Sequence, residues 1–252
     1  MEPNDLGKKI FFLYPPQVLT EAVDELARLE FEVYLARDHE RLKRALASFP
    51  SSILFMDIDE RLDDAGWEAY ARSLRSDMPD LGLGVVTLND DARLRELYLM
   101  GLQVQCGYVV LKLGASKTAE ILAKTLEANE ARGRRKFVRA TCGPGVGQCN
   151  VENEGLTLRA DLTDLSSAGM ALRFEGEPAL RAGSVLKSIA ISVKGQRLIA
   201  SGVVVAKRIG PDGPVHVVMF TPASLDETRR DKLKSLVFKI NQSAMDRVLE
   251  TA

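Results

Sequence analysis

Three closely spaced arginines are the residues of this chain best suited to bind an anion. Arg134 and Arg135 are adjacent, and Arg139 follows four residues after Arg135. A guanidinium is a planar fork of N–H donors that matches phosphate oxygens, or the O6 and N7 edge of guanine, through paired hydrogen bonds. Five of the eight residues from 132 to 139 are basic. This stretch therefore predicts an anion-binding segment.

A second polar stretch begins 25 residues after Arg139 and supplies complementary groups. It contains Asp164, Ser166 and Gly169 in the order Asp-Leu-Ser-Ser-Ala-Gly. A carboxylate only accepts hydrogen bonds, whereas a hydroxyl both donates and accepts, so this loop can bind the N–H groups of guanine. Glycine has no Cβ and lets backbone approach a ligand closely. Together the two stretches suit a phosphodiester that carries guanine.

The order R-R-x-x-x-R followed by D-x-S-x-x-G resembles the PilZ domain family, over roughly residues 132–250. The resemblance implies a small β-barrel that binds the bacterial second messenger cyclic di-GMP and has no catalytic activity or other cofactor. It implies that the arginines clamp the phosphates and guanine edges. Asp164 and Ser166 would hydrogen-bond the purine or orient the arginines, and Gly169 would allow close approach. The ligand-binding residues implied are Arg134, Arg135, Arg139, Asp164, Ser166 and Gly169.

The segments after Arg139 have the pattern of short antiparallel strands, which favours a closed barrel. Ser224, with Glu227 three residues later, is typical of the start of a helix, and an apolar stripe continues to residue 249. We expect this helix to cap the barrel, with a dimer contact as the alternative. The expected strands are Leu156–Leu162, Met170–Phe174, Val185–Val193, Leu198–Ile209 and Val215–Thr221.

The first half of the chain alternates apolar strands with amphipathic helices, which predicts a doubly wound α/β domain with a parallel sheet. The expected helices are Val18–Leu29, Ala65–Leu74, Ala92–Leu102 and one that follows Gly114. The expected strands are Lys9–Tyr14, Phe31–Leu35, Ser52–Asp57, Leu81–Thr87 and Gln103–Leu111.

This half resembles the receiver domain of bacterial response regulators. Asp57, Thr87 and Lys112 end the third, fourth and fifth strands, where the family has its phosphoacceptor, switch hydroxyl and lysine. The chain departs from the family after the first strand, where Tyr14-Pro15-Pro16 replaces the acidic pair that holds Mg²⁺. Phosphoryl transfer needs such a metal to neutralise charge. We therefore expect a phosphorylation-independent domain, with Asp57 as a candidate phosphoacceptor only under the alternative hypothesis.

Length and charge favour two domains with different partners. A chain of 252 residues can form two cores. Residues 1–130 contain 15 Lys and Arg against 23 Asp and Glu, whereas residues 131–252 contain 19 against 12, so the halves carry net charges of −8 and +7. We expect a receiver-like domain at residues 1–126, a basic hinge at 127–139, and a PilZ-like barrel with its helix at 140–252.

Other classes of function have weaker support. The glycine-rich loop at 142–149 lacks the Lys-Ser/Thr of a P-loop and is expected to be a flexible turn. The three cysteines (106, 142 and 149) are expected to be free thiols, His39 and His216 to be surface or strand residues, and no metal site or catalytic triad is apparent. No aromatic series supports nucleic-acid binding.

We therefore expect a cytoplasmic receptor, without membrane insertion, whose two halves rearrange when cyclic di-GMP binds and so control a protein partner. Two alternatives stay open from the sequence. One is a response regulator switched by phosphorylation at Asp57, and the other is an interaction module that binds no nucleotide. The partner, the ligand stoichiometry and the oligomeric state do not follow from the sequence.

Overall fold

The computed structural model describes residues 7–153, 155–210 and 212–252. The chain divides into two compact units, one formed by Met1–Lys136 with Gln242–Ala252 and the other by Phe137–Asn241. Each unit has its own hydrophobic core. Within the described ranges, no helix is both long and apolar enough to span a bilayer.

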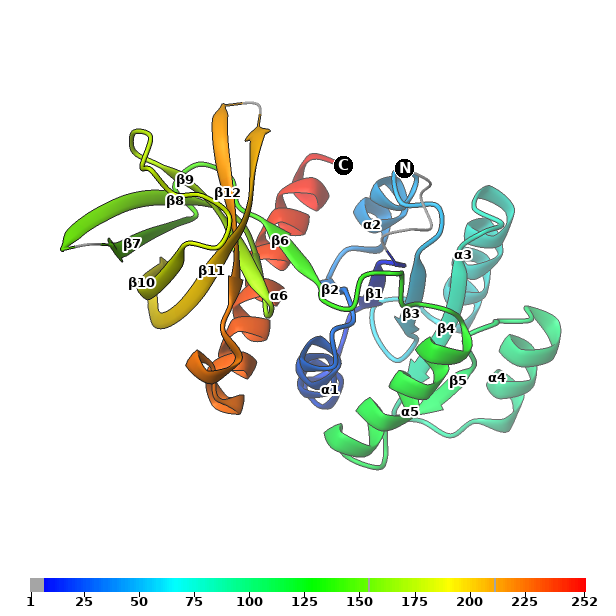
Figure 1. Ribbon diagram of the computed structural model, residues 1–252. Coiled ribbons are helices and arrows are strands. Elements are labelled where there is room, and N and C mark those ends of the chain that lie inside the picture. Colours follow the sequence, from blue (N-terminus) through cyan, green and yellow to red (C-terminus); the bar gives the residue numbers. More distant parts are fainter. Residues whose placement is uncertain (1–6, 154, 211) are drawn as a thin grey trace. The chain divides into compact units, whose positions relative to one another are not determined.

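Strands and helices alternate through the first unit (Figure 1). They are β1 (Ile10–Leu13), α1 (Gln17–Arg28), β2 (Val33–Ala36), α2 (His39–Leu46), β3 (Ile53–Asp57), α3 (Asp64–Asp77), β4 (Gly82–Thr87), α4 (Ala92–Glu96), the π-helical turn η2 (Leu97–Gly101), β5 (Tyr108–Val110) and α5 (Ala115–Ala128). The five strands pair in parallel in the order β2-β1-β3-β4-β5. This is the doubly wound, flavodoxin-like order, so the predicted fold of this half is confirmed.

Burial on both faces of the sheet accounts for the apolar strand pattern of this half. A parallel sheet covered on both faces consists of nearly continuous apolar strands, and every side chain of β1 and β3 is buried. Two helical expectations need correction. Helix α2 was missed because it is short and its buried residues are only Leu42, Ala45 and Leu46. The single helix expected at Ala92–Leu102 is instead α4 followed by η2.

The second unit is a closed antiparallel barrel, as the sequence predicts. Its strands are β6 (Arg139–Thr141), β7 (Gly147–Asn153), β8 (Leu156–Ser166), β9 (Gly169–Phe174), β10 (Val185–Val193), β11 (Gln196–Gly210) and β12 (Gly213–Phe220). Their order is β6-β8-β7-β10-β11-β12-β9, and pairing of β8 with β9 closes six strands into a barrel. Strand β6 adds to the end of β8 that extends past β7.

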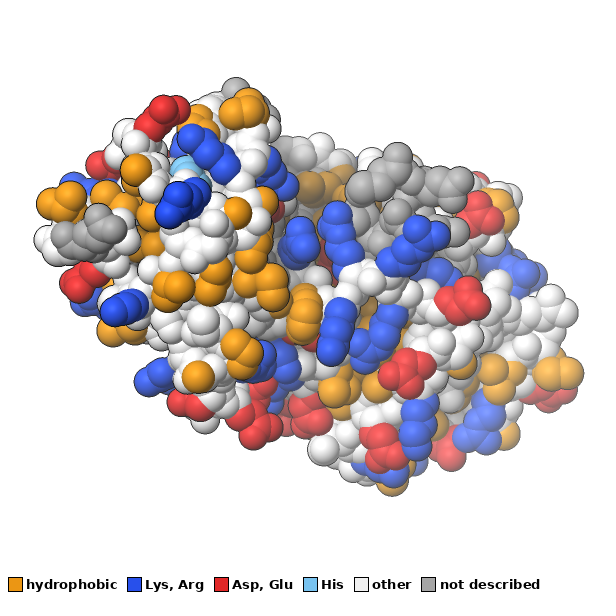
Figure 2. Space-filling view, viewed as in Figure 1, with side chains coloured by type: hydrophobic (Ala, Val, Ile, Leu, Met, Phe, Trp, Pro, Cys, Tyr) orange, Lys and Arg blue, Asp and Glu red, His pale blue; other side chains and the backbone are white. Residues whose placement is uncertain are grey.

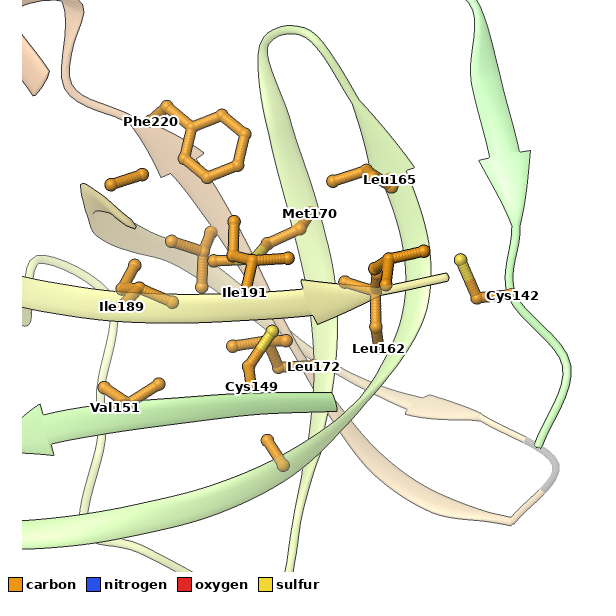
Figure 3. Packing of buried hydrophobic residues seen from close by; sticks show 14 of the residues in the cluster. Cys142, Cys149, Val151, Leu162, Leu165, Met170, Leu172, Ile189, Ile191 and Phe220 are labelled. Carbon is orange, nitrogen blue, oxygen red and sulfur yellow. The ribbon is translucent and has the colours of Figure 1, made fainter. Parts of the chain in front are cut away.

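Alternating side chains of the barrel strands form its core, which Figure 3 shows from close by. Cys149 on β7 lies opposite Ile191 on β10, and both are buried. The expectation of a flexible turn at 142–149 is wrong for its last three residues, because strand β7 begins at Gly147. The alternate residues Cys149 and Val151 of this strand are buried. The three cysteines are free, as expected, and burial raises the pKa values of the Cys142 and Cys149 thiols to about 12.

Helix α6 (Glu227–Thr251) follows the barrel and a short 3-10 turn, η3 (Pro222–Ser224). Its buried residues Leu233, Leu236, Val237 and Ile240 belong to the barrel core, as expected for a helix that caps the barrel. The expected cap residue was wrong. Asp226 Oδ1 accepts from Arg229 N at 2.8 Å, and the Ser224 hydroxyl donates to backbone carbonyl oxygens instead.

The last turns of α6, from Gln242 onward, belong to the first unit. The Gln242 side-chain amide accepts from Leu35 N at 2.8 Å and donates to Leu35 O at 2.9 Å. Leu35 lies on β2, an edge strand whose free backbone groups would otherwise be open to pairing with another chain. Met245 is buried in the core of the same unit. Residues 242–252 thus cover and complete one edge of the α/β unit.

Candidate functional site

Pairing of β6 with the end of β8 brings the two predicted motifs together. Arg139 lies opposite Ser166, and Thr141 lies opposite Asp164. Directly opposed residues of an antiparallel pair have Cβ atoms about 5 Å apart, and alternate residues of a strand share a face. The four side chains therefore project from one face of the β6–β8 pair, although the motifs are 25 residues apart in the sequence.

The carboxylate of Asp164 is held from two sides. Arg208 Nη2, on β11, donates to Asp164 Oδ2 at 2.8 Å. The Thr141 hydroxyl donates to Asp164 Oδ1 at 3.4 Å, a weaker contact. Neither Thr141 nor Arg208 was identified from the sequence, because the contacts depend on strand register rather than on a local pattern. Both oxygens of Asp164 keep lone pairs that can accept further hydrogen bonds.

Ser166 and Gly169 form the turn that joins β8 to β9. The Ser166 hydroxyl donates to Gly169 O at 3.0 Å and accepts from Gly169 N at 3.2 Å. A Cβ on Gly169 would lie 2.3 Å from Val218 O on β12. Glycine is therefore required at 169 by the close approach of β9 and β12.

Arg134 and Arg135 lie in the segment that leads into β6, five and four residues before Arg139. This segment has no regular secondary structure, and the side chains of all three arginines are exposed. Exposed guanidinium groups lie at the surface, where an anion from solution can reach them. The structure thus assembles Arg139, Asp164, Ser166 and Gly169 at one end of the barrel, and places Arg134 and Arg135 immediately upstream in the chain.

A second group of candidate residues lies at the carboxyl edge of the parallel sheet. Asp57 ends β3 with 1% of its surface exposed, and its Oδ1 accepts from Asp59 N at 3.0 Å. Burial raises the pKa of Asp57 to about 6. The hydrogen bond from Asp59 N opposes this shift, and the charges of Asp59 and Glu60 add smaller increases. Thr87 ends β4, as expected, whereas Lys112 follows β5 by two residues and is exposed.

Aromatic groups occupy the position after β1 where a receiver has its acidic pair. The Tyr14 hydroxyl lies 2.7 Å from His39 Nδ1, and the Tyr70 hydroxyl donates to His39 O at 2.8 Å. The rings of Tyr14 and His39 also contact Trp67. His39 is the first residue of α2 and belongs to this aromatic cluster. The expectation of a surface or strand residue is thus wrong for His39. Tyrosine and proline supply no carboxylate for a divalent cation.

Comparison with known proteins identifies one of the two units. Residues 133–239 match the family model described as the PilZ domain. The chain therefore carries a PilZ domain in its second half. This confirms the resemblance inferred from the arginine motif and the Asp-Ser-Gly motif. No curated protein matches the chain.

Solved structures match each half separately. The PilZ domain of YcgR from Escherichia coli, solved with c-di-GMP, is 21% identical, covers 45% of this chain and 96% of its own, and has a TM-score of 0.40. The receiver domain of RcsB from Salmonella enterica serovar Typhimurium is 20% identical, covers 52% of this chain and 95% of its own, and also has a TM-score of 0.40. The signal receiver domain of NarL from Mycobacterium tuberculosis is 15% identical, covers 50% and 99%, and has a TM-score of 0.38.

Proposed function

We propose that this chain, which carries a PilZ domain at residues 133–239, is a non-enzymatic receptor for cyclic di-GMP. The observation that carries the proposal is the β6–β8 register, in which Arg139 lies opposite Ser166 and two residues from the partner of Asp164. A guanidinium, a hydroxyl and a carboxylate then share one surface. Those groups complement a ligand that combines phosphates with guanine.

Each group has a chemical role in the proposed complex. Arg135 and Arg139, assisted by Arg134, clamp the phosphates and the O6 and N7 edges of the guanines. Asp164 and Ser166 hydrogen-bond the purine or orient the arginines. The net charge of +7 over residues 131–252 attracts the anionic ligand towards this half of the chain.

The proposed response is a change in the arrangement of the two units. The arginines at 134 and 135 precede the barrel in a segment without regular structure, so a ligand that binds them together with Asp164 and Ser166 would order that segment. Such a ligand shifts the population of conformations in proportion to its differential affinity for them. A downstream protein partner would then bind one arrangement in preference to the other.

Calorimetric titration of cyclic di-GMP into the full chain tests the receptor proposal. The variants are Arg135→Ala and a matched control, Arg197→Ala, which removes an exposed arginine near the start of β11. We expect micromolar or tighter binding to the wild type and to the control. Loss of Arg135 should cost about 2–5 kcal/mol, as for other buried charged contacts in a complex. GTP should produce no comparable heat.

Two outcomes would contradict the proposal in different ways. Absence of binding to the wild type would leave the ligand-free interaction module as the better hypothesis. Binding that Arg135→Ala and Arg197→Ala weaken equally would place the ligand elsewhere on the basic half.

Small-angle scattering with and without cyclic di-GMP then tests the response, because a rearrangement of the units changes the radius of gyration and a ligand that only occupies the barrel does not.

A further inference from the structure

The Asp164 carboxylate is held by a guanidinium that comes from far along the chain. Arg208 donates to Asp164 Oδ2 at 2.8 Å, although the two residues are 44 positions apart. The Arg208 side chain is 55% exposed and that of Asp164 is 28% exposed. A single Nη group makes this contact, and Thr141 binds the other carboxylate oxygen. Two donors on two oxygens restrict the rotation of the carboxylate.

Arg208 reaches this position because β11 is long. The strand has 15 residues and forms a hairpin with β12, in which Arg208 lies opposite Val215, close to the hairpin tip. Figure 1 shows this hairpin extending beyond the rest of the barrel, and Figure 2 shows Lys and Arg side chains gathered just below its tip. A second pair, Arg173 with Asp212 at 2.8 Å, also ties this hairpin to β9. The β11–β12 hairpin thus brings the Arg208 guanidinium to Asp164.

An oriented carboxylate can distinguish purines by their donors. Guanine presents N1–H and the exocyclic N2–H₂ side by side, so that both can be donated to one carboxylate. Hypoxanthine keeps O6, N7 and N1–H but lacks the amino group. A carboxylate that is free to turn loses rotational freedom when it accepts from both donors, which reduces the gain from the second hydrogen bond. A carboxylate that is already fixed does not have this loss, so its preference for the base with both donors is larger.

We propose that Arg208 is a positioning residue that holds Asp164 in the orientation from which it selects guanine through the exocyclic amino group. This inference rests on the proposed function, since it concerns the same ligand site. Arg208 acts through Asp164 and need not contact the ligand. Its removal therefore affects the choice between guanine and hypoxanthine more than it affects general attraction of an anion.

The experiment compares cyclic di-GMP with cyclic di-inosine monophosphate, which has the same phosphates but lacks the two amino groups. Calorimetry gives both dissociation constants for the wild type, Arg208→Met, Arg208→Lys and the control Arg197→Met. We expect the wild type to prefer cyclic di-GMP by about tenfold, within the range for one well-made base contact. The preference should fall towards unity in Arg208→Met, return at least in part in Arg208→Lys, and stay unchanged in Arg197→Met.

The outcomes separate this inference from the proposed function. Failure of the wild type to bind cyclic di-GMP would reject both. Binding without preference for guanine in the wild type would reject the role of Arg208 alone. An equal loss of affinity for both nucleotides in Arg208→Met, up to loss of all measurable binding, would assign Arg208 to general anion attraction and overturn the inference. Unchanged circular dichroism of Arg208→Met verifies that the barrel is folded.

Discussion

The Thr87 hydroxyl donates a hydrogen bond of 2.7 Å to Asp59 Oδ1 at the carboxyl edge of the parallel sheet. The same carboxylate accepts from Leu88 N at 2.5 Å and from Asn89 Nδ2 at 3.1 Å. Asp59 is thereby committed to organising the loop after β4. The acid nearest to Asp57 in the sequence is therefore a structural residue of this loop, and it is poorly placed to replace the acidic pair missing after β1.

We predict that Asp57 is not phosphorylated by small phosphodonors. Incubation of the chain with acetyl phosphate and Mg²⁺ should leave its intact mass unchanged, because Tyr14-Pro15-Pro16, the segment directly after β1, supplies no carboxylate to hold the metal beside Asp57. Cyclic di-GMP binding should be the same before and after the incubation. A mass increase of one phosphoryl group that disappears in Asp57→Asn would instead favour the response-regulator hypothesis.

The strands were predictable from the sequence because their signal is local. Fully buried strands such as β3 are continuous apolar runs, and β10 alternates buried and more exposed side chains from Ile189 to Val193. The elements that were missed lack such a signal. Helix α2 is short and largely polar, and the glycines before β7 concealed the alternation of Cys149 and Val151.

The site was predictable only as far as its motifs extend along the chain. Arg139, Asp164 and Ser166 were identified from residue type and spacing, and the β6–β8 register places them on one surface. Arg208 was not identifiable, because its contact with Asp164 depends on the closure of β8 on β9 and on the length of the β11–β12 hairpin. No local pattern encodes either feature.

Burial of Asp57 should make the stability of the first unit depend on pH. Its pKa is raised from 3.8 to about 6, so between these pH values the folded state keeps a proton that the unfolded state has released. Stability therefore falls as pH rises through this window and is constant above it. Asp57→Asn keeps an acceptor for Asp59 N and removes the charge. We expect this variant to be more stable at pH 7.5 by on the order of 2–3 kcal/mol, with little difference near pH 4.

Urea unfolding followed by tryptophan fluorescence measures this effect. Trp67 is the single tryptophan of the chain and is fully buried in the first unit, so its emission reports the unfolding of that unit. Asp80→Asn, at an exposed position, is the control and should change the stability by less than about 0.5 kcal/mol. A stabilisation by Asp57→Asn that is equal at both pH values would contradict the assigned cause.

Gly169→Ala should destabilise the barrel whether or not a ligand is bound. The new Cβ would lie 2.3 Å from Val218 O, so β9 and β12 must separate, at a cost of about 1–3 kcal/mol. Hydrogen exchange measured by mass spectrometry should show faster exchange in the peptides of both strands. Gly143→Ala, where a Cβ meets nothing within 4 Å, is the control. Normal exchange with lost cyclic di-GMP binding would show that Gly169 acts only on the ligand.

His216 should make the barrel sensitive to acid. It lies on β12, 1% exposed, with its ring edge-on to Phe174 at 5.2 Å between centroids. Among the described residues, neither ring nitrogen has a hydrogen-bond partner of ordinary geometry. Burial and the charge of Lys207 lower the pKa of His216, opposed by the Leu180 backbone and Glu177. The unfolded state therefore binds a proton more readily, and stability is lost as pH falls below about 6.5.

His216→Phe should remove this sensitivity and stabilise the barrel. Phenylalanine keeps the aromatic contact with Phe174 and has no buried nitrogens to desolvate, which favours the variant by about 1–3 kcal/mol at pH 7. The difference in free energy of unfolding between the variant and the wild type should grow from pH 7 to pH 5. Over this range the unfolded wild type binds a proton at His216 that the folded wild type does not, and the variant has no such group. Urea-dependent hydrogen exchange of the β9 and β12 peptides, corrected for intrinsic rates, measures both values. A wild-type barrel equally stable at pH 5 and pH 7 would mean that His216 finds a partner for its proton, and that the unpaired nitrogens do not limit stability.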